Sequence, residues 1–128
     1  MRQVLIVLAS LTLGLTACSS GAETSGVASN CVDLTGEGSA FTIQMVNLQF
    51  VPECFSASAS QAFTLINEDE VAHIFTLEKV GVPVRLIDVT VDGETFNGEA
   101  LSSVVEPGTY QIFCRFHLLM AGRATVVT

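Results

Sequence analysis

The chain has 128 residues, with 13 acidic and five basic side chains, and its formal net charge at pH 7 is −8. This length predicts a single domain with one ordinary hydrophobic core, in addition to any processing signal. The acidic balance excludes nucleic acid as a partner, because that binding needs a basic surface, and it is compatible with a basic protein partner.

Residues 1–17 are predicted to be a targeting signal. Arg2 supplies a positive start, and residues 4–15 form an apolar run that is too short to span a bilayer. The run ends in Leu15-Thr16-Ala17-Cys18, which resembles the lipobox of bacterial lipoproteins. The resemblance implies that Cys18 becomes the acylated first residue of the mature chain, and two or more acyl chains hold a protein stably on a membrane. The alternative is an ordinary secretory signal that contains a chance cysteine.

The next segment, residues 18–30, is predicted to be a flexible tether that begins at the lipidated cysteine. From residue 19 it is small, polar and nearly free of large apolar side chains, so it cannot bury enough surface to order itself. Random-coil scaling gives such a segment a reach of about 20 Å.

A period of two begins at Phe41, where Phe41, Ile43 and Met45 alternate with Thr42 and Gln44. Short strand-like runs continue from there to the end of the chain, separated by turn residues at Pro52, 81–83, 92–93, 97–98 and 107–108. The pattern predicts an all-β fold, an antiparallel Greek-key β-sandwich, over residues 31–128. Residues 92–103 are less regular, and the pattern leaves a loop and a short helix open there.

The last predicted loop contains the ligand types of a soft metal site. Cys114, His117 and Met120 follow one another with the spacing Cys-x2-His-x2-Met, and His73 is the only other histidine of the chain. A zinc site takes four firm nitrogen or sulfur ligands and has no use for a methionine. A blue-copper site takes two histidines, one cysteine and a weak axial methionine, and this set matches it. The alternative is that these side chains are ordinary core and surface residues.

Several further motifs resemble those of the cupredoxins, small blue-copper proteins such as plastocyanin, amicyanin and pseudoazurin. The spacing of the ligand loop is similar to the short loop of amicyanin. The other matching motifs are Phe50-Val51-Pro52, Asn67 six residues before His73, Glu106-Pro107-Gly108-Thr109-Tyr110, and Met120-Ala121-Gly122 before the closing strand. The resemblance covers about residues 39–128, and it implies one type 1 copper ion held by His73, Cys114, His117 and Met120.

With Cys18 assigned to lipid and Cys114 to copper by these resemblances, Cys31 and Cys54 remain. Disulfides persist outside the cytoplasm, so we expect a Cys31–Cys54 bridge. Two buried free thiols are the alternative.

The sequence departs from the family pattern next to the ligands. Ile74 and Arg115 stand where most relatives have a hydrogen-bonded pair, an Asn after the first His and a Ser or Thr after the Cys. Leu118 replaces the Pro after the second His, and Ser60 stands where a Gly is expected. No ligand is lost, but the missing hydrogen bonds leave the rigidity and the potential of the site open.

The resemblance implies an electron carrier, lipid-anchored on the outer side of a membrane of the cell envelope. We expect a monomer and no enzymatic activity, with a redox protein such as a cytochrome or a copper oxidase or reductase as donor or acceptor. Phe116, Leu118 and Leu119 are expected to form the apolar docking patch around His117, although some of them could instead point into the core. Residues 68–70 either steer a cationic partner or form a solvated acidic turn. A copper-delivery protein is the alternative function, although such sites are usually richer in Met and His.

Overall fold

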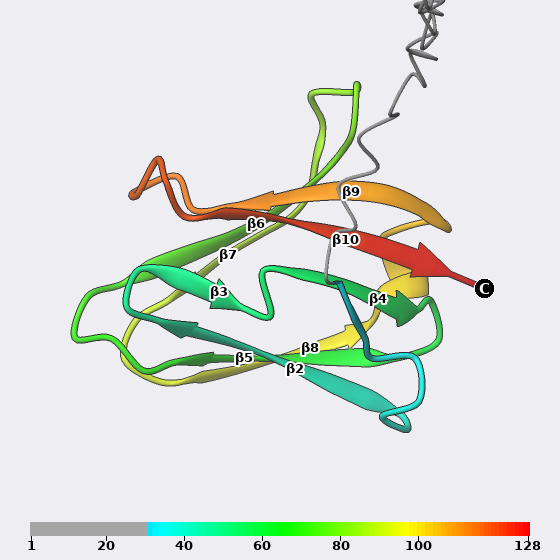
Figure 1. Ribbon diagram of the computed structural model, residues 1–128, viewed down its shortest axis with the longest axis horizontal. Helices are drawn as coiled ribbons and strands as arrows, with labels where there is room; N and C mark the ends of the chain where they lie inside the picture. The colour runs from blue at the N-terminus through cyan, green and yellow to red at the C-terminus, as the bar shows by residue number, and fades with distance from the viewer. Residues whose placement is uncertain (1–30) are drawn as a thin grey trace, which may run out of the picture.

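The computed structural model describes residues 31–128, so the predicted signal, Cys18 and the tether lie outside the described residues. The described chain forms two β-sheets (Figure 1). The six-stranded sheet has the order β1 (Val32–Asp33), β4 (Cys54–Ser58), β10 (Ala121–Val127), β9 (Gly108–Phe113), β6 (His73–Lys79) and β7 (Arg85–Val91). The four-stranded sheet has the order β3 (Gln49–Val51), β2 (Ala40–Val46), β5 (Ala62–Asn67) and β8 (Thr95–Ala100).

The predicted β-sandwich is confirmed, with a more mixed pairing than expected. The pairs β1–β4, β4–β10 and β2–β5 are parallel, and the other five pairs are antiparallel. Residues 92–103, for which the sequence left a loop or a short helix open, contain the strand β8 and then a short 3₁₀ helix, η1 (Leu101–Ser103). The turn expected at 97–98 is therefore wrong, because Asn97 pairs with Thr64 of β5 inside the sheet. Within residues 31–128, no helix has the length and apolar character needed to cross a membrane.

The core lies between the sheets and is built from alternate residues of the strands. Phe41, Ile43 and Met45 of β2 are buried, as their spacing predicts. Aromatic rings join the two layers, because the ring centroids of Phe41 and Phe55 are 5.5 Å apart. The resulting sandwich is a firm base for the loops at its ends.

The disulfide between Cys31 and Cys54 is present, as expected. It joins the first described residue to the start of β4 and encloses a sequence separation of 23 residues. Beside it, the N–H of Leu34 donates to Ser56 O. The short edge strand β1 is therefore held to β4 both covalently and by hydrogen bonds.

Strand order brings distant parts of the chain together at one end of the sandwich. β6 pairs antiparallel with β9, and Thr76 lies opposite Phe113. The start of β6 at His73 therefore lies beside the end of β9, where the β9–β10 loop begins. Figure 1 shows this loop at the left end of the molecule, together with the β2–β3 and β5–β6 connections.

Candidate metal centre

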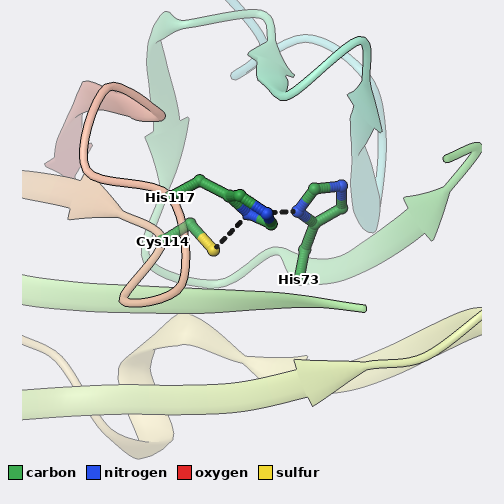
Figure 2. Close-up of side chains that lie close together, drawn as sticks. All are labelled: His73, Cys114 and His117. Atoms are coloured by element: carbon green, nitrogen blue, oxygen red, sulfur yellow. Dashed lines mark hydrogen bonds between the residues drawn. The ribbon is translucent and has the colours of Figure 1, made fainter. Parts of the chain in front are cut away.

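His73, Cys114 and His117 converge at this end of the sandwich (Figure 2). One ligand atom from each residue lies within 4.8 Å of the other two. His73 starts β6, whereas Cys114 and His117 belong to the β9–β10 loop. The structure thus brings together three residues that the sequence predicted as ligands.

The distances between these atoms fit one bound ion. The two Nδ1 atoms of His73 and His117 are 3.3 Å apart, and Nδ1 of His117 is 3.5 Å from Sγ of Cys114. Zinc–nitrogen and zinc–sulfur bonds in proteins are about 2.0 and 2.3 Å, so two donors of a single ion of this size are separated by less than about 4.5 Å. One thiolate and two imidazoles are also the donor set that copper accepts.

Cys114 is buried, and a backbone group faces its sulfur. Its side chain is only 2% exposed, and the N–H of Ile74 points at Sγ over 3.4 Å. A backbone donor stabilises negative charge on sulfur. Ile74 therefore contributes its backbone N–H to the site, while its own side chain is buried in the core.

Met120 closes the loop that carries Cys114 and His117. The N–H of Cys114 donates to Met120 O at 2.9 Å, and the N–H of Met120 donates to His117 O at 2.9 Å. Met120 is 1% exposed and His73 is fully buried, whereas His117 is partly exposed. The loop is thus fixed by its own backbone, and His117 is the member of the three-residue cluster that reaches the surface.

Asp69 positions His73, a role that the sequence did not reveal. Its Oδ2 lies 2.8 Å from Nε2 of His73, and this bond places the ring proton on Nε2 and leaves Nδ1 free as a donor to a metal. The same carboxylate accepts the backbone N–H groups of Leu48 and Asn47. The bond from Leu48, with further contributions from His73 and Asn47, holds the pKa of Asp69 below its ordinary value although partial burial opposes this.

Asn67 in turn fixes the acidic turn that contains Asp69. Its side-chain amide donates to Val71 O and Val91 O, and its Oδ1 accepts the N–H of Asp69. The sequence left two interpretations of residues 68–70, a charge that steers a cationic partner and a solvated acidic turn. Neither applies to Asp69, because its carboxylate is hydrogen-bonded to His73. A carboxylate four residues before a predicted ligand histidine is the signal that could have indicated this contact.

We expect Asp69→Asn to weaken metal binding about 10- to 100-fold, which is the usual effect of removing a group that orients a ligand histidine. The amide cannot provide the same charged partner for Nε2–H. Competition of the protein against a copper chelator measures the change. Glu70→Gln is the matched control, since it removes the same charge from an exposed neighbour. Equal affinities of the two variants would contradict the role of Asp69.

Arg115 forms an ion pair with β7, which is separated from β9 by β6. Its guanidinium donates to both carboxylate oxygens of Asp88, at 2.9 and 3.3 Å. Thr76 Oγ1 also donates to Asp88. The pair is partly exposed, with the two side chains 40% and 31% accessible, so it contributes about 0–1 kcal/mol. It connects the residue after Cys114 to β7.

The residues predicted to form the docking patch all lie at the surface. Phe116, Leu118 and Leu119 are 59%, 92% and 100% exposed, so none of them points into the core. Leu48 and Val71, from the connections next to Asp69, are about half exposed. We name these five residues the apolar collar; it lies at the same end of the sandwich as His117.

Comparison with known proteins finds similarity at the level of three-dimensional structure. No family model matches the sequence, and no curated protein matches it significantly. A structure of a reduced amicyanin mutant aligns with a TM-score of 0.56 and 19% identity, over 71% of this chain and 84% of that chain. A Cu(I) amicyanin mutant aligns with a TM-score of 0.57 and 16% identity, over 70% and 83%.

A third match is the copper-containing nitrite reductase of Thermus scotoductus SA-01. It aligns with a TM-score of 0.56 and 22% identity, over 70% of this chain but only 22% of the reductase chain. At such low identities the likeness concerns the fold. The chain therefore has a cupredoxin-like β-sandwich fold, with a His-Cys-His cluster at one end of it.

Proposed function

We propose that the protein is a membrane-anchored type 1 copper protein that transfers electrons between redox partners. The observation that carries this proposal is the convergence of His73, Cys114 and His117 on one point, with Met120 at the end of the same closed loop. A copper ion bound there would supply a one-electron Cu(II)/Cu(I) couple.

The surrounding residues hold the donors in place before any ion binds. Asp69 fixes the ring of His73, and the backbone bonds within residues 114–120 fix the positions of Cys114 and His117. Because His73 starts a strand of the packed sandwich and the loop with Cys114 and His117 is closed by its own hydrogen bonds, these groups have little freedom to follow a change in charge. A site that moves little on gain or loss of an electron needs little reorganisation, and this favours rapid outer-sphere transfer.

Burial favours a carrier over an enzyme. His73, Cys114 and Met120 are almost inaccessible, so a substrate has no route to their donor atoms. The partly exposed imidazole of His117 is the natural exit for an electron. The nitrite reductase match spans a minor part of that enzyme and does not by itself imply catalysis in this chain.

The surface around His117 suits a protein partner with an apolar centre and a cationic rim. The apolar collar lies at the same end of the sandwich as this exit, and Glu68 and Glu70 lie on the β5–β6 connection there. Complementary charges accelerate the encounter of partners, and an apolar centre allows close contact. A cytochrome or a copper oxidase or reductase is the class of partner that we propose.

Copper loading tests the electron-transfer function. We expect residues 19–128 with Cu(II) to give intense visible absorption from thiolate-to-copper charge transfer, which ascorbate bleaches and a mild oxidant restores over repeated cycles. Electron paramagnetic resonance should follow the same cycles. Colourless Cu(II) protein would contradict the type 1 site. Rapid transfer of the copper to an acceptor chelator, without reversible cycling, would instead favour copper delivery.

The anchor is tested separately at Cys18, in the lipobox-like sequence. We expect Cys18→Ser to move the protein from the membrane fraction to the soluble fraction and to leave its visible spectrum unchanged, since the four proposed ligands all lie within residues 73–120. Fractionation and absorption measure the two properties. Ser19→Ala is the control and should stay on the membrane. A Cys18→Ser protein that remains there in high salt would contradict acylation.

A further inference from the structure

The connection between β6 and β7 is an exposed apolar tip with a cation at each end. Val80, Val82 and Val84 are 56%, 45% and 51% exposed, and Lys79 and Arg85 flank them. We name residues 79–85 the valine tip. Aliphatic side chains that are exposed together in this way indicate a surface that contacts something apolar.

The charge of the valine tip is opposite to that of the rest of the domain. Without Arg2 and Glu23, which precede the described residues, the chain has 12 acidic and four basic side chains. Two of the four basic side chains are in the valine tip, which contains no Asp or Glu. A third, Arg115, is paired with Asp88. Lys79 and Arg85 therefore give the valine tip a local positive charge on an acidic protein, although Glu78 lies opposite Arg85 in the β6–β7 register and accepts a hydrogen bond from Gln111.

The valine tip is an ordered projection. The N–H of Val82 donates to Lys79 O, and the N–H of Val80 donates to Thr109 O at the start of β9. Figure 1 shows this connection projecting past β9 at the top of the view. The valine side chains thus lie on a projecting turn. The apolar interior of a lipid bilayer is fluid, so it can surround such a turn without a preformed cavity.

We propose that the valine tip docks on an anionic lipid bilayer. The valines enter the apolar boundary, and Lys79 and Arg85 lie level with the negative headgroups, as in other interfacial membrane contacts. The proposal rests on the membrane location proposed above and does not depend on copper binding. The surface of a bilayer has charged headgroups outside and hydrocarbon beneath. The valine tip has the matching order, because its aliphatic side chains project beyond a cation at each end.

This docking sets the orientation of the metal centre. β6 has seven residues, with His73 at one end and Lys79 at the other, and a strand rises about 3.3 Å per residue. The valine tip and His73 are therefore about 20 Å apart along β6. With the tip in the membrane, the apolar collar stays clear of the lipid and available to a soluble redox partner.

Tryptophan fluorescence tests the contact, because the chain contains no tryptophan of its own. Val82→Trp introduces a single probe at the tip, and Val71→Trp places the matched control near His73, where the native valine has a similar exposure of 48%. The full lipidated chain is bound to vesicles of phosphatidylcholine with one-fifth phosphatidylglycerol. The tryptophan emission in brominated lipid is divided by that in ordinary lipid, and this ratio cancels any quenching by the metal. Circular dichroism confirms that each variant is folded.

We expect the probe at residue 82 to shift to the blue and to be quenched by brominated lipid, while the probe at residue 71 keeps the emission of an exposed side chain. Replacing Lys79 or Arg85 by Gln in the Val82→Trp protein should weaken docking about fivefold per charge removed. Two water-exposed probes on vesicle-bound protein would overturn the valine-tip proposal and leave anchoring intact. Quenching at residue 71 instead, or at both positions, would overturn it as well. Protein that does not bind the vesicles at all overturns both the tip and the anchor.

Discussion

Cys114→Ser protein loaded with Cu(II) is expected to be colourless. The intense absorption of a type 1 site arises from charge transfer between a cysteine thiolate and copper, and Cys114 is the one free cysteine among the described residues. Serine keeps the size and the fold of the site but removes the sulfur. The visible band should therefore vanish completely, and measurement of the absorption spectrum at equal copper content decides the result.

Arg115→Ser is the matched control for this prediction. It places serine at the next residue and removes the exposed ion pair with Asp88, but it leaves all four proposed ligands in place. We expect this variant to stay blue, with at most a modest change in stability. A blue Cys114→Ser protein, or a colourless Arg115→Ser protein, would contradict the assignment of Cys114 as the thiolate ligand.

The second large effect is expected at the Cys31–Cys54 disulfide. The double variant Cys31→Ser/Cys54→Ser should lose about 3 kcal/mol of unfolding free energy, because the bridge restricts a loop of some two dozen residues in the unfolded chain. Denaturant unfolding of the metal-free protein measures the change. The reduced native protein should unfold at the same midpoint as the variant. If the reduced protein and the variant instead unfolded at the midpoint of the oxidised protein, the bridge would contribute nothing to stability.

The sequence predicted the parts of the molecule that have a local signature. Alternation at Phe41, Ile43 and Met45 indicated β2 and its buried face. The turn residues at Pro52, 81–83, 92–93 and 107–108 marked four of the connections between strands, whereas the turn expected at 97–98 lies inside β8. The ligand spacing in residues 114–120 indicated the loop, and the scarcity of histidine pointed to His73. The strand and the clustering of His73, Cys114 and His117 were predictable because the periodicity of a strand and the chemical type of a side chain are properties of the residues themselves.

The rest depends on which strands become neighbours, and local sequence does not contain that information. The Arg115–Asp88 ion pair requires β6 and β9 to be adjacent and β7 to follow at the edge. Asp69 resembled its acidic neighbours in the sequence, and its contact with His73 requires the turn that Asn67 fixes. The parallel pairing of β4 with β10 is likewise a property of the whole topology.

The position of the disulfide has a mechanical consequence. A pull on the chain ahead of Cys31 passes through the bridge into Cys54 and bypasses the two-residue strand β1. β4 runs parallel to β10 over five paired residues, from Arg123 opposite Cys54 to Val127 opposite Ser58. A load along β4 is therefore shared by several hydrogen bonds in shear, and they do not open one after another. The loop of residues 114–120 ends just before β10. It is therefore attached to a strand that shares the load, but the force does not pass through the loop itself.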